Sequence, residues 1–326
     1  MPSAPVLAEA GLSSPRLGPR DGLALMSSGA ASAAHASLNA VDAERLLGAS
    51  LAVAALSFSA AGADPVVLNS RVHAARPHSG QIEVAARLRE MLGEPAAAPG
   101  GPAGTPVHDP YPFRALAQVE GATFDARRAL EGVLAVELNA AGENALIEAG
   151  TPAALANANF HGGQLALALD HLRAALAQSS SLVAARVSAL LDPGLMGLPA
   201  ALSVRPGPDS GAMMLEYTAH AAAAEVRWLA APVANQTATV AGGLESHASF
   251  APLAARRTEE ALRLAGVTLA TELAVAVRAL RLRGVAPAGA AAGELFARAA
   301  ERLDADLSDR PLGPDVESLR ELLFDD

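Results

Sequence analysis

Apolar residues recur at steps of three and four along most of this chain, which is the spacing of one face of an α-helix. The clearest stretch covers residues 251–282, with apolar positions at 262, 265, 269, 273, 276 and 280. Residues 164–191 repeat the pattern with leucines at 165, 169, 172 and 176. The sequence has no internal repeat and no strand-like alternation. The pattern predicts an all-α fold, a bundle of long helices with functional loops at its ends.

Further helices are predicted over residues 22–63, 82–92, 119–139 and 210–231, with one or two more after residue 293. Within the first of these, charged residues 42–45 are interpreted as a start signal, and Asp64-Pro65 as the stop.

The domain organisation is predicted from the proline and glycine content. Residues 95–106 are rich in both and are expected to form a flexible loop inserted into one helical domain, residues 20–326. Residues 1–19 are expected to be a poorly ordered N-terminal segment.

Composition narrows the class of protein. Of 326 residues, 51% are hydrophobic but only 3% are aromatic, so alanine, the best helix former, carries the apolar fraction. The absence of cysteine excludes disulfides, thiolate metal sites and a cysteine nucleophile. A net charge of −10 argues against a nucleic-acid partner. The most apolar run, residues 51–63, is too short to cross a bilayer, and no signal peptide is recognised. We expect a soluble, cytoplasmic protein.

Residues 107–114 contain the first candidate chemistry. His108, Tyr111 and Arg114 are spaced three apart, so they project to one side wherever this segment coils. An imidazole, a phenol and a guanidinium in one place could hold an amino-acid carboxylate and handle a proton. An arginine beside a tyrosine at a helix start is more often structural, so the segment alone leaves both interpretations open.

Eight short segments, in order along nearly the whole chain, resemble the histidine and phenylalanine ammonia-lyase family. They are residues 20–25 (RDGLAL), 76–81 (RPHSGQ), 108–114 (HDPYPFR), 137–144 (ELN and EN), 159–162 (NFHG), 197–199 (GLP), 244–249 (LESHAS) and 254–257 (AARR). Each segment is weak alone, but their shared order favours membership of the family. The resemblance implies the helical fold of these lyases and an enzyme that breaks a carbon–nitrogen bond.

The resemblance also implies roles for single residues. Arg114 would bind the substrate carboxylate as a bidentate clamp. Tyr111 would act in catalysis beside the electrophile, and Glu245 would face the amino group.

Four other positions complete the implied site. Phe160 would wall the pocket, and His108 and Asn159 would be further substrate-binding residues. Ser27 would contact the cofactor, since it stands where the family has an asparagine that does so.

Such lyases build a methylidene-imidazolone electrophile from an internal Ala-Ser-Gly, and a tyrosine in an upstream loop acts as the base. No Ala-Ser-Gly occurs in this sequence, and Ser27-Ser28-Gly29 is the nearest analogue. The resemblance therefore implies the C-terminal subunit of a split enzyme, whose partner chain supplies the electrophile and the tyrosine in trans. It also implies a tetramer of the complete unit, a hetero-oligomer with active sites built from several subunits and a small amino-acid substrate.

Several positions depart from the family pattern. His108 stands in place of glutamine, Leu244 and Ser246 in place of glutamine and aspartate, Val226 in place of asparagine, and Gly163 in place of glutamate or glutamine. Lost polar neighbours loosen the groups that aim a site. The alternatives are therefore a non-catalytic scaffold or regulatory subunit, a 2,3-aminomutase component, and a remnant or small-molecule-binding protein that acts alone.

The histidines can be interpreted as structural residues. His78 and His161, at loop ends, are expected to be hydrogen-bonded structural residues rather than catalytic ones. The pairs His73/His78 and His108/His161 lack the spacing of a metal motif, so no metal site is predicted.

Overall fold

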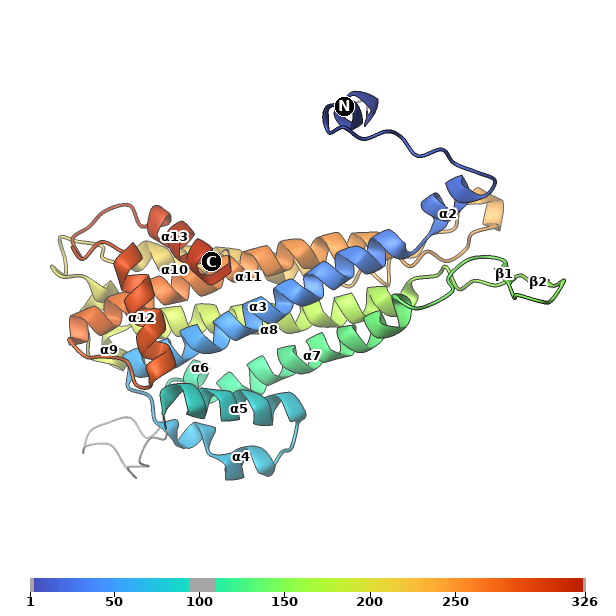
Figure 1. The fold of residues 1–326 in the computed structure, drawn as a ribbon. Helices are drawn as coiled ribbons and strands as arrows, with labels where there is room; N and C mark the ends of the chain where they lie inside the picture. The colour runs from blue at the N-terminus through green and yellow to red at the C-terminus, as the bar shows by residue number, and fades with distance from the viewer. Residues whose placement is uncertain (1–2, 94–108, 325–326) are drawn as a thin grey trace.

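Five long helices form the body of the chain in this computed structural model, which describes residues 3–93 and 109–324 (Figure 1). They are α3 (Ala30–Ala61), α7 (Leu116–Glu137), α8 (Gly163–Leu191), α10 (Met213–Leu229) and α11 (Ala251–Arg283). The all-α bundle predicted from the apolar periodicity is confirmed. The loop predicted over residues 95–106 lies outside the described residues.

Shorter elements cap the ends of the bundle. The helices are α1 (Ser3–Glu9), α2 (Asp21–Ser27), α4 (Ser70–Ala74), α5 (Ser79–Leu92), α6 (Tyr111–Arg114), α9 (Pro193–Met196), α12 (Ala290–Arg302) and α13 (Gly313–Phe324). Three 3-10 turns are η1 (Pro65–Leu68), η2 (Ala200–Leu202) and η3 (Ala241–Gly243). The strands β1 (Leu146–Ile147) and β2 (Ala154–Leu155) pair antiparallel as a small hairpin.

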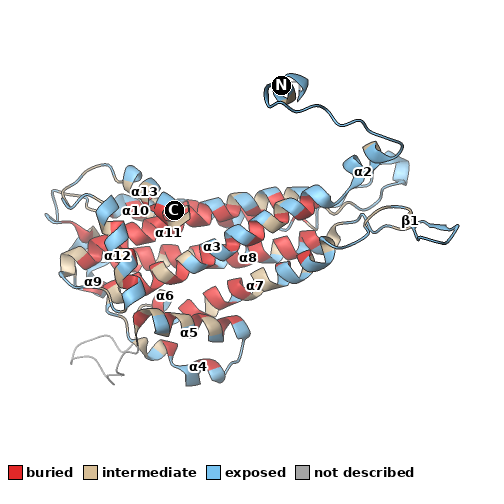
Figure 2. Ribbon diagram, viewed as in Figure 1, coloured by how far each residue is buried: buried red, intermediate tan, exposed pale blue. Residues whose placement is uncertain are grey.

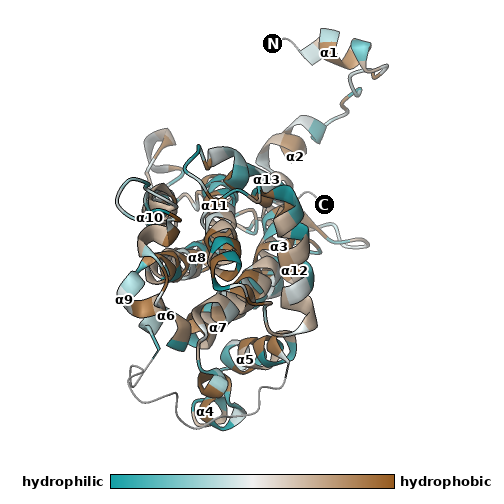
Figure 3. Ribbon diagram, turned by 90° about the vertical axis from the view of Figure 1, so that its left-hand side faces the viewer, coloured by the Kyte–Doolittle hydropathy of each residue, from teal (hydrophilic) through white to brown (hydrophobic). Residues whose placement is uncertain are grey.

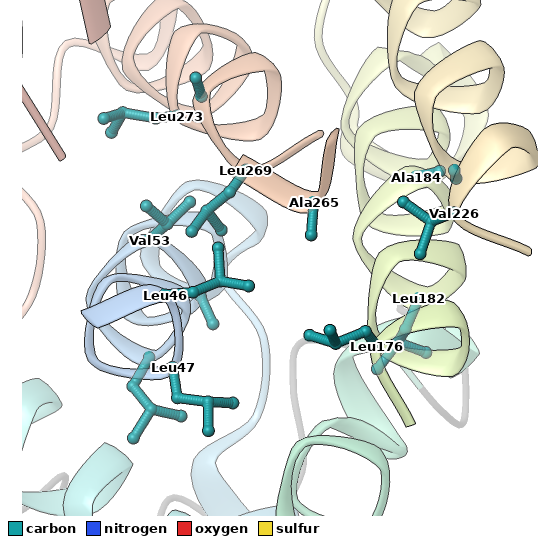
Figure 4. Close-up of a cluster of buried hydrophobic side chains, with 14 of the residues drawn as sticks. Leu46, Leu47, Val53, Leu176, Leu182, Ala184, Val226, Ala265, Leu269 and Leu273 are labelled. Atoms are coloured by element: carbon teal, nitrogen blue, oxygen red, sulfur yellow. The ribbon is translucent and has the colours of Figure 1, made fainter. Parts of the chain in front are cut away.

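The core lies where α11 packs along α3, α8 and α10, and where α8 packs on α7. Figure 4 shows leucine, valine and alanine side chains of α3 and α11 in one part of this core and those of α8 and α10 in another. The buried faces run along the long helices. In contrast, α2 and most of the loop that carries β1 and β2 are exposed (Figure 2). Viewed from one end, the apolar sides of the helices point inward (Figure 3). Burial of this apolar surface is the main stabilising term.

Two core helices, α3 and α8, are long and apolar enough to cross a membrane by length and composition alone. Their most apolar windows are 67% and 72% buried inside the bundle. Buried core helices pass the same test, so this finding is weak support for a membrane span.

The predicted start of the first long helix at residues 42–45 is wrong. Helix α3 begins at Ala30, and Asp42 and Arg45 form an ion pair on one of its middle turns at 3.7 Å. The true start follows Gly29, which has no capping side chain. The polar group at this boundary is the Ser28 hydroxyl, which accepts the backbone N–H of Ala30 at 3.0 Å. The helix ends at Gly62 with a left-handed φ of 64°, just before the predicted stop at Asp64.

A polar layer crosses the middle of the bundle. Arg186 of α8 and Glu272 of α11 are fully buried and form a bidentate pair, with Nε–Oε1 and Nη2–Oε2 distances of 2.6 and 2.9 Å. Nearby, both carboxyl oxygens of Glu120 in α7 lie 3.0 Å from the Ser179 hydroxyl of α8. Burial raises the pKa of Glu120, and the opposing effects of Arg186 and the Ser179 hydrogen bond are smaller.

The N-terminal segment projects from the bundle (Figure 1). Neither α1 nor α2 contains a buried residue. The side chain of Arg20, which precedes α2, donates from Nη2 to the Asn144 carbonyl oxygen at 3.2 Å and lies 3.7 Å from the Glu143 carboxylate. These contacts tie the start of α2 to the loop that carries β1 and β2.

Candidate functional site

Tyr111 and Arg114, here called the α6 cluster, occupy the single turn of α6. The guanidinium carbon of Arg114 lies 5.9 Å from the centre of the Tyr111 ring, within the range of a cation–π contact. The predicted clustering of these two side chains is thus confirmed. Tyr111 is 69% exposed, so the cluster faces solvent. His108, the third member expected here, lies outside the described residues.

One buried and one exposed contact hold the α6 cluster in place. Phe113 is fully buried and meets Phe58 of α3 edge to face, with ring centroids 6.3 Å apart. The Asp109 carboxylate accepts the backbone N–H of Asp64 at 2.7 Å, beyond the end of α3. The exposed pair is therefore mounted on a fixed support.

Ser27, Asn159, Phe160 and Glu245, here called the loop cluster, lie at the other end of the bundle. Ser27 is the last residue of α2, Asn159 and Phe160 precede α8, and Glu245 lies on the loop that precedes α11. All four are exposed, Phe160 at 49%.

Asparagine side chains shape the segment before α8. The Asn144 side chain accepts the backbone N–H of Asn157 at 3.1 Å, and the Asn157 side chain accepts that of Asn159 at 2.8 Å. On the neighbouring loop, Val240 and Glu245 exchange backbone hydrogen bonds of 2.7 and 3.4 Å. These local bonds set the backbone positions from which Asn159, Phe160 and Glu245 project.

His161 is hydrogen-bonded, as expected from the sequence. Its Nε2 lies 2.9 Å from Nδ1 of His247. His73 is buried, and its two ring nitrogens contact the Val67 carbonyl oxygen and the Gln81 amide at 3.1 and 3.0 Å. Burial lowers the pKa of His73, and the hydrogen bond to Val67 opposes this. His73 thus has no nitrogen left for a metal shared with His78.

Among the described residues, no group of three or more histidine, aspartate or glutamate side chains is arranged to hold a metal ion. The pair His108/His161 falls partly outside those residues, so its geometry is not described.

One chain does not bring the two clusters together. The α6 cluster lies at the start of α7, whereas α2 and the loops of the loop cluster lie at the opposite end of the bundle (Figure 1). A helix of 22 residues is about 33 Å long. A site that uses both Arg114 and Glu245 therefore needs residues from more than one chain.

Sequence reasoning missed two features of these regions. No role was assigned to His247, although it stands two residues after Glu245 in a segment that was recognised. The buried Arg186–Glu272 pair was also missed, although both charges interrupt apolar runs at helical spacing, which is a detectable signal.

The sequence is similar to those of known proteins. The family model for aromatic amino acid lyases matches residues 1–301. The histidine ammonia-lyases of Geobacillus kaustophilus and Symbiobacterium thermophilum are 35% and 36% identical over 98% of this chain. The chain spans 63% of the length of these two relatives.

Solved structures share the fold. Pantoea agglomerans phenylalanine aminomutase aligns with a TM-score of 0.92 and 26% identity, over 99% of this chain and 67% of that one. Histidine ammonia-lyase from Trypanosoma cruzi aligns with a TM-score of 0.88 and 27% identity, over 98% of this chain and 60% of that one. The chain belongs to the aromatic amino acid lyase family.

Proposed function

We propose that this chain is the C-terminal subunit of a two-chain amino acid ammonia-lyase. In this proposal a partner chain carries the Ala-Ser-Gly electrophile and the catalytic tyrosine, and the assembly is a tetramer of the complete unit. The substrate is a small α-amino acid with an aromatic or imidazole side chain. Glu245 and the similarity to histidine ammonia-lyases favour the imidazole.

The observation that carries this proposal is the division of the family's site residues between two ends of one bundle. Each cluster is mounted on ordered structure, yet each is open to solvent. Large exposed aromatic side chains such as Tyr111 and Phe160 are suited to contact another chain or a substrate. Copies that pack with opposite ends side by side would join the α6 cluster of one to the loop cluster of another.

The residues of this chain would bind and orient the substrate. Arg114 would hold the carboxylate through paired N–H donors, a geometry that a guanidinium provides and an ammonium does not. Glu245 would accept a hydrogen bond from the amino group, and the Tyr111 hydroxyl would donate one near the reacting carbon.

Four further side chains would complete the pocket. Phe160 would exclude water from one wall, and the Asn159 amide, with His108, would contact the rest of the substrate. The exposed Ser27 hydroxyl, at the end of α2, would face the electrophile of the partner chain.

The residues present fit a methylidene-imidazolone supplied from outside the chain, because the side chains assigned to it are exposed rather than packed in the core. When bound, that group supplies the electrophile that makes ammonia a better leaving group. The chain itself would contribute positioning, hydrogen bonding and exclusion of water.

Two other functions keep specific support. A component of a 2,3-aminomutase is favoured by the structural similarity to phenylalanine aminomutase. A non-catalytic scaffold is favoured by Leu244, which is 89% exposed where the resemblance expects a glutamine beside Glu245.

The test is affinity purification of the tagged full chain from its native host, followed by intact mass analysis. We expect a second chain that contains Ala-Ser-Gly and whose mass is lower by two waters. Recovery of the chain alone, with no such partner, would refute the two-chain proposal. Product analysis of the purified complex then separates an unsaturated acid (lyase) from a β-amino acid (aminomutase) or no product (scaffold).

A further inference from the structure

His161 and His247 join two loops that carry site residues. His161 follows Phe160 directly, and His247 stands two residues after Glu245. The Nε2 of His161 and Nδ1 of His247 are 2.9 Å apart, and the ring centroids are 5.0 Å apart at an interplanar angle of 46°. In segments 156–162 and 240–249, all of whose residues are described, this is the hydrogen bond that links one segment to the other.

The backbone leaves room for this pair. A side chain at Gly163 would place its Cβ 2.9 Å from Cε1 of the His161 ring. A Cβ at Gly162 would lie 3.0 Å from the Cβ of Ala251, the first residue of α11. The family's larger residue at position 163 would therefore displace the His161 ring from its present position. The imidazole pair in its present position therefore depends on glycine at position 163.

The bond depends on protons. Two neutral imidazoles, or one neutral and one charged, can share one N–H between Nε2 and Nδ1. Two imidazolium rings cannot, because both nitrogens then carry hydrogen and both rings are positive. The pair therefore tolerates one added proton and is broken by the second.

Charged and dipolar groups of both signs surround the pair. The pair lies beside the first turns of α8 and α11, whose N-terminal ends carry partial positive charge. Arg256 is the first charged residue of α11, and Asp170, that of α8, is already paired with Arg173. The loop of residues 240–249 contributes the Glu245 carboxylate. Glu143, whose carbonyl oxygen accepts a hydrogen bond from the Asn157 side chain, is paired with Arg20 beside the other segment.

We propose that the His161–His247 bond, here called the imidazole clasp, is a positioning device for the candidate site. It holds the Phe160 segment against the Glu245 loop while at least one ring is neutral, and it releases them when both are protonated. The consequence for catalysis rests on the proposed function, whereas the clasp is a property of this chain alone.

The test uses spin labels on the full chain. Because the chain has no cysteine, the pair Ala156→Cys and Ala238→Cys places one label on each loop without further changes. Distances between the labels are measured at about pH 8 and about pH 5, on either side of the ordinary histidine pKa of about 6.5. We expect a narrow distance distribution at the higher pH and a longer, broader one at the lower pH.

Three variants make the measurement specific. His161→Ala should give the broad distribution at both pH values, because the bond is gone. His161→Gln should stay narrow at both, because its amide reaches the Nε2 position and can bond to either form of His247. His220→Ala, which removes a hydrogen bond to Ser188 on the side of the bundle, should behave like the parent chain.

Two outcomes would overturn the clasp: a narrow distribution in His161→Ala at both pH values, or acid broadening in His161→Gln equal to that of the parent. The second outcome would show that acid broadens the distance distribution by a general effect near the sequence pI of 5.3, and not by breaking this bond.

A second measurement separates the clasp from the proposed function. In the purified complex, His161→Gln should retain kcat/KM below pH 6.5, where the parent loses it. Identical pH profiles for His161→Gln and the parent would show that the clasp has no role in catalysis. A complex without any activity would refute the proposed function. The label distances, which do not depend on activity, would still test the clasp.

Discussion

Arg186, Glu272 and Glu120 lie fully buried halfway along the bundle, whereas Tyr111, Arg114, Phe160 and Glu245 lie exposed at its ends. The buried charges are largely compensated: two of them form a bidentate ion pair, although Nη1 of Arg186 has no hydrogen-bond partner, and a raised pKa favours the neutral form of the third. The end groups are exposed, and no described residue encloses them in this way. Displaced pKa values often mark a functional site, but here the clearest displaced carboxyl marks the core. In the proposed assembly, residues of other chains would enclose the end groups.

The largest effect is expected when the buried pair is broken. Arg186→Leu leaves the Glu272 carboxylate buried without a partner, which should lower the free energy of unfolding by about 3–5 kcal/mol. The double variant Arg186→Leu with Glu272→Leu should recover most of this loss, since neither charge of the pair is then left buried without its partner. Urea denaturation of both variants measures the difference. Equal losses in the single and double variants would contradict the ion-pair explanation.

At the α6 end we expect a loss of function without a loss of stability. Arg114→Ala in the purified complex should lower kcat/KM about 10- to 100-fold, because hydrogen bonds to charged groups contribute about 1.5–3 kcal/mol. Its free energy of unfolding should change by less than about 0.5 kcal/mol, since the side chain is exposed. Arg71→Ala, exposed at the same end, is the matched control. Unchanged steady-state kinetics for Arg114→Ala would favour the scaffold alternative.

Glu120 should make stability depend on pH. Burial raises its pKa in the folded chain, so between its unfolded pKa of about 4.3 and the higher folded pKa the folded state binds more protons. The free energy of unfolding should then fall as the pH rises through this window, by up to about 1.4 kcal/mol per pH unit. Glu120→Gln should remove this slope. Thermal unfolding across the pH range tests it, and an identical slope in Glu120→Gln would show that another group is responsible.

The smallest effect is expected for an exposed pair of the same chemical type. Glu260 and Arg263 are bonded at 3.0 and 2.7 Å on the surface of α11. Glu260→Gln should cost less than about 1 kcal/mol, and less still in high salt, because water and ions screen the pair. A loss as large as that of Arg186→Leu would mean that burial does not decide the strength of these pairs.

The sequence allowed α11 to be predicted almost to the residue, because its apolar spacing is unbroken and its end is marked by Gly284. It failed at the start of α3, because alanine forms most of the first turn and Ser28, which accepts the Ala30 N–H, was interpreted only as part of an Ala-Ser-Gly analogue. The apolar pattern also gave no prediction that Glu272 is buried, although this residue stands three positions after Leu269 and four before Ala276, on the buried face. Hydrophobic patterning treats a charge there as an exception, and only the position of Arg186 on another helix explains it.

The candidate site was predicted in its residues but not in its arrangement. Family motifs named both Arg114 and Glu245, yet no local rule on spacing could show that the length of α7 keeps them apart. His247 was missed for a related reason. Its partner, His161, is 86 residues away along the chain, so the bond exists only once the fold has formed.

Two defective copies of this gene could therefore rescue each other. In the proposed assembly, a site takes its arginine from one copy and its glutamate from another. Cells that produce both an Arg114→Ala chain and a Glu245→Gln chain would build some sites from the two intact ends, although neither chain alone would build one. Interallelic complementation of this kind is a phenotype, and it can be scored without purifying any protein.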